Sequence, residues 1–405
     1  MAIAITLVAA ACAGADTTTT IGDAPDQGTT SPPGATTTTS AEAGGGEGEA
    51  LTATPAGGWS STFIGTGIKP VLDLDSSGSP AVAYLEERLS EGFVAYAAAA
   101  EDWAVDLFVE GYFYGPIGLA FDGEDRPNIV WHDHQADQFD LELGDLTYAV
   151  RDGGDWAMIT ASHDGHDGWD STIAIGSDGV VRAAGIDPAQ FDRTDGVEYY
   201  ELRDGSFVVE AIGTGPIVYE FNVGLAIGAD GVPVVSYYDH LDQSLRFGRR
   251  TEAGWDLVTI DDTLDSGKYS DVALDDQGRA HISYLIQTGA NSGTIGYAVE
   301  DGSGGWVRED VGEITDLETG HFGARRVTSI DLVDGSPHIA FSDKSGIWVA
   351  SRTDAGWSVD QVLTAGSLVL GQLVSLEIDQ DGTHHIAYWE HTADDMGLIG
   401  YLTNG

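Results

Sequence analysis

A tryptophan that returns about every fifty residues is the feature that most constrains how this chain can fold. Each copy follows a turn rich in Gly or Asp, and Phe207 takes the place of tryptophan once. The copies are Trp59, Trp103, Trp156, Trp255, Trp306 and Trp357, and neighbouring anchors lie 44 to 53 residues apart. Repeats of about 40 to 50 residues with four strands each are typical of β-propeller blades. The spacing therefore predicts a ring of similar sheets, with these tryptophans as structural anchors.

The segments between the tryptophans have the pattern of strands. Residues 327–357, VTSIDLVDGSPHIAFSDKSGIWVASRTDAGW, contain apolar and β-branched runs separated by polar turns. Residues 373–390, LVSLEIDQDGTHHIAYWE, repeat the first two of these runs. Val, Ile, Tyr and Trp fit half-buried strands, and Asp-Gly supplies the positive φ of a hairpin turn. No segment between the turns shows a helical apolar period. We therefore expect an all-β protein with four antiparallel strands per blade.

The two ends of the repeat region predict how the ring closes. The last repeat stops at Gly405 after its third strand, and the first begins with a lone fourth-strand sequence, WSSTFIG, at Trp59. Pairing the first strand with the last blade removes an exposed sheet edge. Seven sets of three strands then match seven fourth strands. We expect a seven-bladed β-propeller over residues 58–405.

This repeat resembles that of exported bacterial propellers with SLALD, PHIAYYD, LKYA and W segments, a group loosely similar to sialidases. PHIAFSD at 337–343 is one such segment here. The sialidase Asp-box, Ser-x-Asp-x-Gly-x-Thr-Trp, is not found, because GSGGW at 302–306 and TDAGW at 353–357 lack its spacing. The resemblance implies the fold, and it says little about function.

The first residues predict export. Residues 1–16 are an apolar leader in which Ala9-Ala10-Ala11-Cys12 resembles a lipobox, so Cys12 is a candidate for lipidation. No Lys or Arg precedes the apolar run, which leaves a short leader with a chance cysteine as the alternative. Residues 17–57 are rich in Thr, Gly and Pro and are expected to form a flexible linker. We expect a monomer at a bacterial cell surface or in the periplasm, contacting membrane only through its lipid anchor.

The charge is extreme, with 17 basic and 66 acidic residues and a formal net charge of −49. Such a surface repels phosphate backbones, so we expect no nucleic-acid partner. The acidic residues are spread along the chain, which favours adaptation to a salty environment. A cation-rich ligand or bound calcium is the alternative.

An acid followed by histidine recurs at the end of the second strand in blades two, four and seven. The pairs are Asp133-His134, Asp239-His240 and Glu390-His391, whereas Glu86 and Asp343 keep the acid alone. In a propeller these positions share a face with the start of each innermost strand, where ligands usually bind. Imidazole beside carboxylate suits ligand or metal binding and proton transfer. The alternative is that the acids accept backbone hydrogen bonds at the corner.

A loop between blades two and three could hold a metal. It carries His163, Asp164, His166 and Asp167, with Trp169 beside it. Mixed imidazole and carboxylate ligands suit zinc or manganese, and a solvated acidic loop is the alternative. The Asp-Gly turns on the opposite face are predicted as hairpin turns, with calcium loops as the alternative. No cofactor is certain from the sequence.

Four arginines are candidates for binding an anion on the face where ligands usually bind. Arg325 and Arg326 precede the first strand of blade six, and Arg88 and Arg193 lie in loops of blades one and three. Guanidinium groups bind carboxylate or sulfate bidentately. Charge compensation by Asp316 and Glu318 is the alternative.

No nucleophile elbow, phosphate loop, HExxH or zinc-finger spacing is present. The sequence therefore favours a non-catalytic binding module for a glycan or an envelope protein. The alternative is a glycan-active enzyme, either a sialidase-like hydrolase or a metal-assisted polysaccharide lyase. A purely structural part of the envelope is the third reading.

Overall fold

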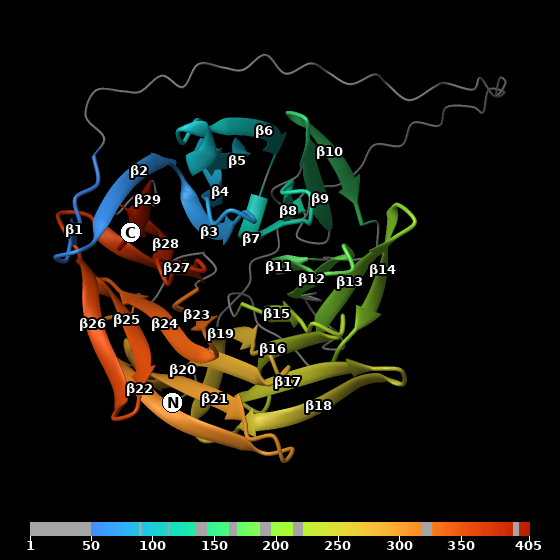
Figure 1. Ribbon diagram of the computed structural model, residues 1–405, viewed down its shortest axis with the longest axis vertical. Helices are drawn as coiled ribbons and strands as arrows, with labels where there is room; N and C mark the ends of the chain where they lie inside the picture. Colours follow the sequence, from blue (N-terminus) through green and yellow to red (C-terminus); the bar gives the residue numbers. More distant parts are fainter. Residues whose placement is uncertain are drawn as a thin grey trace, which may run out of the picture. The chain divides into compact units, whose positions relative to one another are not determined.

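The computed structural model describes residues 50–405 apart from 89–90, 112, 134–143, 162–167, 187–195, 214–221, 318–325 and 392–396. Seven antiparallel sheets stand around a common axis, and the strand order within each runs from the axis outward (Figure 1). The fold class predicted from the sequence is confirmed. Cys12 and residues 17–49 of the predicted linker lie outside the described residues. No helix among the described residues is long and apolar enough to cross a membrane.

The blades follow one another along the chain. Blade one contains β3 (Ile68–Leu74), β4 (Pro80–Arg88), β5 (Glu91–Ala98) and β6 (Asp106–Gly111), with a 3-10 turn, η1 (Ala99–Glu101), before β6. Blade two contains β7 (Phe113–Phe121), β8 (Pro127–Asp133), β9 (Asp145–Asp152) and β10 (Asp155–Thr160). Blade three contains β11 (Trp169–Ile175), β12 (Val181–Ile186), β13 (Val197–Arg203) and β14 (Ser206–Ala211). Blade four contains β15 (Gly224–Ile227), β16 (Pro233–Asp239), β17 (Ser244–Thr251) and β18 (Gly254–Asp261).

The remaining blades complete the ring. Blade five contains β19 (Asp265–Leu274), β20 (Ala280–Gly289), β21 (Ser292–Glu300) and β22 (Trp306–Ile314). Blade six contains β23 (Thr328–Val333), β24 (Ser336–Asp343), β25 (Gly346–Thr353) and β26 (Gly356–Thr364). Blade seven contains β27 (Val369–Ile378), β28 (His384–His391) and β29 (Gly397–Thr403), and its outer strand is β2 (Ser60–Thr66).

The ring closes as the sequence predicts, because β2 pairs antiparallel with β29 from Ser60↔Thr403 to Thr66↔Leu398. A second contact was not foreseen. The short strand β1 (Thr54–Pro55) pairs with β26 of blade six, so residues 50–57, which we expected to be linker, belong to the fold. The N-terminal segment thus joins the outer edges of two adjacent blades.

The repeated tryptophans pack between neighbouring blades. Trp156 of blade two lies against Tyr96 of blade one, with ring centroids 5.7 Å apart, and Trp357 of blade six lies 5.1 Å from Tyr297 of blade five. The same contact recurs in the pairs Trp103–Tyr401, Phe207–Tyr148, Trp255–Tyr199 and Trp306–Phe247. Each aromatic pair contributes about 0.5–1.5 kcal/mol beyond its buried area. The predicted structural role of these anchors is confirmed.

The Asp-Gly sequences form the turns between first and second strands. In blade seven, Asp379 Oδ1 accepts hydrogen bonds from the N–H groups of Asp381 (2.9 Å) and Thr383 (2.8 Å). Gly382 has a φ of 82°, which glycine adopts at no steric cost. The predicted hairpin turns are therefore confirmed.

Candidate binding site at the channel mouth

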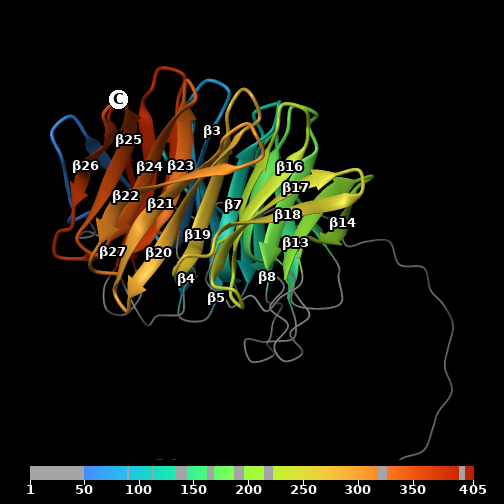
Figure 2. The same ribbon diagram turned by 90° about the horizontal axis from the view of Figure 1, so that it is seen from below.

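The blade topology gives the ring two different faces. The innermost strands β3, β7, β11, β15, β19, β23 and β27 all begin at one face, which also carries the connections between blades and between second and third strands. We call this the loop face, and we call the opposite one, with the Asp-Gly turns, the turn face. Figure 2 shows the strands running between them. Every residue at the start of an innermost strand consequently lies near the mouth of the central channel.

The acids of the predicted acid–histidine pairs are engaged in the fold where the structure describes them. Asp239 Oδ1 accepts a hydrogen bond from the N–H of Leu241 (3.0 Å), and its other oxygen lies 3.0 Å from an Arg246 nitrogen. Asp343 likewise accepts from Ser345 N (2.8 Å). Asp133 ends β8 and is half-buried. Backbone capping thus accounts for Asp239 and Asp343.

Glu390 has a different structural task. Its side chain is fully buried, and its carboxylate accepts hydrogen bonds from Thr52 N (2.8 Å), Thr52 Oγ1 (2.7 Å) and Ala53 N (3.1 Å). The neighbouring His391 is buried and stacks on Trp389 at 4.4 Å, whereas His240 is exposed. Glu390 therefore holds the N-terminal segment against blade seven.

Several predicted site residues lie outside the described residues. These are His134, His163, Asp164, His166, Asp167, Arg193 and Arg325, and of Arg88 only the backbone, at the end of β4, is described. Trp169 begins β11 and is half-buried, with its ring 4.9 Å from that of His132. Within the described part of the chain, no group of three or more His, Cys, Asp or Glu could hold a metal ion.

Arg326 is the predicted anion-binding residue that the structure places most clearly. It precedes β23 at the loop face, and its backbone bridges Leu373 of blade seven. The residue is 8% exposed, and its buried Nε finds no hydrogen-bond acceptor among the described residues. Burial raises the pKa of Glu377 of β27, and the positive charge of Arg326 partly opposes that rise. A buried guanidinium with an unused donor at a channel mouth is suited to an incoming anion.

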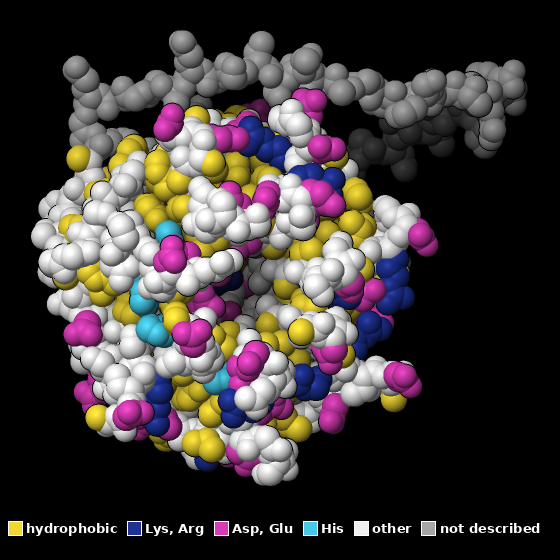
Figure 3. Space-filling view, viewed as in Figure 1, with side chains coloured by type: hydrophobic (Ala, Val, Ile, Leu, Met, Phe, Trp, Pro, Cys, Tyr) yellow, Lys and Arg dark blue, Asp and Glu magenta, His cyan; other side chains and the backbone are white. Residues whose placement is uncertain are grey.

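Carboxyl groups line the channel nearer the turn face than the Arg326 backbone, because Asp73 and Glu377 are the penultimate residues of β3 and β27. Asp73, Asp331 and Glu377 occupy matching positions on β3, β23 and β27, and Figure 3 shows acidic side chains around the central opening. Asp73 Oδ2 accepts from Phe121 N of blade two (2.8 Å), and Asp331 Oδ2 accepts from Ile378 N of blade seven (2.7 Å). These two carboxylates join the innermost strands of adjacent blades.

The channel shifts the proton affinity of these carboxyl groups. Burial, followed by repulsion from Asp331, raises the pKa of Asp73 to about 7, and burial raises the pKa of Asp331 to about 6. Burial and repulsion from Asp331, Asp73 and Asp271 raise the pKa of Glu377 well above its usual value. No described residue donates a hydrogen bond to Glu377, so it is the channel carboxyl that is available for a ligand or a proton.

The channel mouth also contains two of the three lysines of the chain. Lys69 and Lys268 are 6% and 8% exposed at the starts of β3 and β19, and Lys268 Nζ lies 2.6 Å from Asp265. Lys69, Asp170 and Tyr269 have positive φ values of 57°, 51° and 54°. Left-handed backbone at non-glycine residues costs about 1–3 kcal/mol and clusters at functional sites. Asp125, Asp204 and Asp334 on the turn face have the same conformation, so these φ values do not single out one face.

Sequence reasoning missed a group of histidines on the turn face, which Figure 3 shows over blades five to seven. His384 Nε2 and His338 Nδ1 are 2.9 Å apart, and burial lowers the pKa of His384 to about 4. His385 contacts Tyr401 Oη (2.5 Å) and Asp379 (3.4 Å), and His281 makes the equivalent contacts in blade five. The recurring triplet His-Ile-Ala or His-Ile-Ser was the available signal. These contacts give the histidines a structural role.

Comparisons with known proteins bear on the fold of this chain. No family model matches the sequence, and no curated protein matches it. An ulvan lyase of polysaccharide lyase family PL25 is 14% identical with a TM-score of 0.57, covering 83% of this chain and 94% of that one. The polysaccharide lyase Uly1 is 10% identical with a TM-score of 0.51, covering 82% and 89%. An α-L-arabinanase of Penicillium chrysogenum is 10% identical with a TM-score of 0.50, covering 87% and 98%. At these identities the likeness shows a shared fold.

Proposed function

We propose that this protein is a carbohydrate-binding propeller whose loop face binds an acidic glycan, with Arg326 taking the carboxylate or sulfate group. The observation that carries the proposal is the buried Arg326 guanidinium, whose Nε has no acceptor among the described residues. Burying a cationic donor without an acceptor is costly unless a ligand supplies one. A bidentate contact to a planar anion would supply it.

The charge of the chain makes this position selective. A net charge of −49 repels anions from most of the surface, so an acidic sugar needs a local cation to bind. Arg326 provides that cation at a mouth where Lys69 and Lys268 also lie. The named structural neighbours, two polysaccharide lyases and an arabinanase, act on or bind glycans, which supports a glycan as ligand. Export and anchoring through Cys12 would present the ring to extracellular polymers.

A second candidate function, glycan cleavage, is favoured by Glu377. Its pKa is raised well above the usual value, first by burial, and the positive charge of Arg326 acts on it. A carboxyl group with a raised pKa keeps its proton to a higher pH and can act as a general acid, and perturbed groups of this kind cluster at active sites. In this reading Arg326 would orient an acidic sugar, and Glu377 would transfer the proton.

Replacing Arg326 should distinguish a binding site from a structural charge. We expect Arg326→Gln to weaken binding of uronate oligosaccharides by about 10- to 100-fold, because one charge-assisted hydrogen bond is lost. Calorimetry should compare these ligands with their carboxyl-reduced counterparts, which are expected to bind equally to parent and variant. Arg203→Gln, at an exposed arginine of blade three, is the control. Equal uronate affinity of Arg326→Gln and the parent would refute the proposal, and release of new sugar ends would establish the second function.

A further inference from the structure

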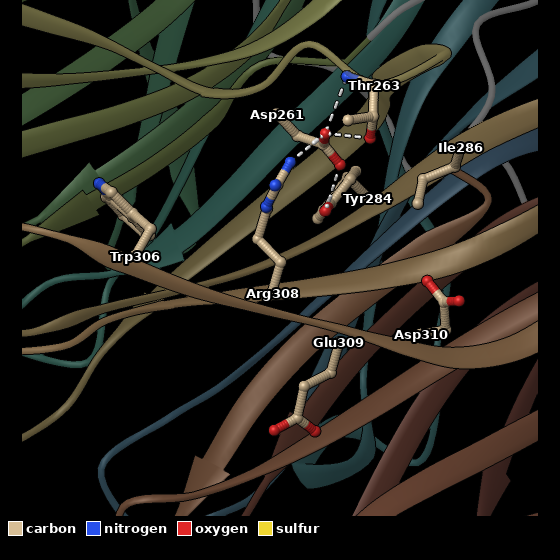
Figure 4. Close-up of a pocket in the computed structure, with 8 residues that line it drawn as sticks. All are labelled: Asp261, Thr263, Tyr284, Ile286, Trp306, Arg308, Glu309 and Asp310. Atoms are coloured by element: carbon tan, nitrogen blue, oxygen red, sulfur yellow. Dashed lines mark hydrogen bonds and ion pairs between the residues drawn. The ribbon is translucent and has the colours of Figure 1, made fainter.

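A cleft on the rim between blades four and five is separate from the channel mouth. It holds about 470 Å³, which lies within the range of small-molecule sites. Figure 4 shows Asp261 and Thr263 on one side, and Trp306, Arg308 and Asp310 from β22 on the other. Tyr284 of β20 lies behind Asp261. None of these residues belongs to the loop-face site.

The residues of this cleft depart from the repeat. Arg308 lies two positions after the tryptophan anchor, where the other blades have Ser61, Val105, Met158, Val209, Leu257 and Val359. Asp261 lies six positions after Trp255, where blade six has the fully buried Leu363 and blade five has Gly312. Polar residues at positions that the repeat fills with apolar or small ones carry a desolvation cost. Repeat proteins place such departures where function requires them.

The cleft is held in a fixed geometry. Asp261 is 3% exposed and accepts hydrogen bonds from Tyr284 Oη (2.9 Å), Thr263 N (3.0 Å) and Thr263 Oγ1 (2.5 Å), and it also pairs with Arg308. The Arg308 side chain keeps 41% exposure, so part of the guanidinium still faces the opening. An arginine fixed on one edge presents its remaining donors with little loss of rotamer entropy on binding.

The other groups of the cleft determine the kind of ligand. Asp310 is exposed and adds carboxylate acceptors on the same strand as Arg308, and Trp306 offers a half-buried ring at one end. Glu309 points the other way in Figure 4 and pairs with Arg352 (2.8 Å) and Trp357 Nε1 (2.9 Å). Hydrogen-bond donors and acceptors that lie side by side suit adjacent hydroxyl groups on one edge of a sugar. The aromatic ring next to them suits the apolar face of the same sugar. The acidic walls disfavour an anionic ligand.

We propose that this cleft is a second carbohydrate site, specific for a neutral sugar, in which Arg308 and Asp310 bind adjacent hydroxyl groups against Trp306. It goes beyond the loop-face function, because it takes a ligand of different charge at a different place. A chain with both sites would bind a polymer of mixed neutral and acidic sugars at two points. When one polymer occupies both sites, the second binding event is intramolecular, so the overall affinity exceeds that of either site alone.

The test is titration of the full chain with methyl glycosides of common neutral hexoses, 6-deoxyhexoses and pentoses. We expect at least one glycoside to bind. Arg308→Gln and Asp310→Asn should each weaken that binding at least about tenfold, because one charged hydrogen bond is lost. Asp310 is exposed, so its variant should fold even where Arg308→Gln does not. Arg352→Gln is the matched control, because it breaks an equivalent ion pair between blades five and six.

The outcomes separate this site from the one at the channel mouth. Neutral-sugar binding that survives Arg326→Gln but is lost in the Arg308 and Asp310 variants supports the cleft, whatever happens to uronate binding. If no neutral glycoside binds, or if binding is unchanged in both cleft variants, the proposal is overturned. Equal loss of binding in Arg352→Gln would also overturn it, because the effect would then follow from ring stability.

Discussion

Deletion of residues 1–66 should abolish cooperative folding of this protein, whereas deletion of residues 1–49 should leave its thermal unfolding almost unchanged. The two deletions differ by the segment that carries β1 and β2. That segment pairs with β29 of blade seven and β26 of blade six. Without it, the ring would have an open edge on its last blade.

The expected loss is large because several contacts disappear together. The pairing of β2 with β29 spans six residue pairs, and each backbone hydrogen bond contributes about 1 kcal/mol net. Ile64 is 5% exposed, and burying such a side chain contributes about 2 kcal/mol. Glu390 would lose the donors of Thr52 and Ala53, and a buried charge left unpaired costs about 3–5 kcal/mol. The total is comparable with the whole stability of a protein, about 5–15 kcal/mol.

Calorimetry and near-ultraviolet circular dichroism would measure this difference. Glu390→Ala in the full chain isolates one part of the closure, and we expect it to lower the free energy of unfolding by about 2–4 kcal/mol, since the Thr52 and Ala53 amides lose their acceptor. Asp239→Ala, at the corresponding acid of blade four, is the control for removing a local cap. A chain lacking residues 1–66 that melts cooperatively within a few degrees of the parent would show that the ring does not depend on closure.

The fold was predictable because its evidence lies in local sequence repeated along the chain. The spacing of Trp103, Trp156 and the other anchors marks the length of one blade. Each anchor side chain packs against an aromatic residue of the preceding blade. Ring closure followed from counting strands. The contact of β1 was missed, because two paired residues in a Thr- and Pro-rich segment leave no periodic signal.

The site was less predictable because the same residue type serves different tasks in different blades. Glu390 and Asp239 share a repeat position, yet one fixes the N-terminal segment and the other caps its own corner. Long-range partners such as Thr52 cannot be read from a repeat. The cleft at Arg308 was visible as an exception to the repeat, but only the structure brings Asp261 of the preceding blade beside it.

Glu377→Gln should stabilise the protein at pH 8 by about 1–2 kcal/mol, an unusual sign for a substitution inside a fold. At that pH the channel holds Asp73, Asp271, Asp331 and Glu377 together, with Arg326 as the neighbouring cation. Burial and mutual repulsion raise the pKa of Asp73 to about 7 and that of Asp331 to about 6, and they raise the pKa of Glu377 well above its usual value. Glutamine keeps the shape and removes one of the repelling charges.

The sign of the pH dependence follows from proton binding. Between about pH 4 and 7 the folded protein binds more protons at these acids than the unfolded chain does, so their contribution to stability falls as pH rises. Burial lowers the pKa of His384 to about 4, which has the opposite effect, because the unfolded histidine binds its proton first as pH falls.

The quantity to measure is therefore the difference in unfolding free energy between Glu377→Gln and the parent at pH 5 and pH 8. We expect it to be near zero at pH 5 and stabilising at pH 8. Glu313→Gln, at an exposed acid of β22, is the control. A Glu377→Gln chain that is less stable than the parent at pH 8 would show that the ionised carboxylate is a favourable partner of Arg326.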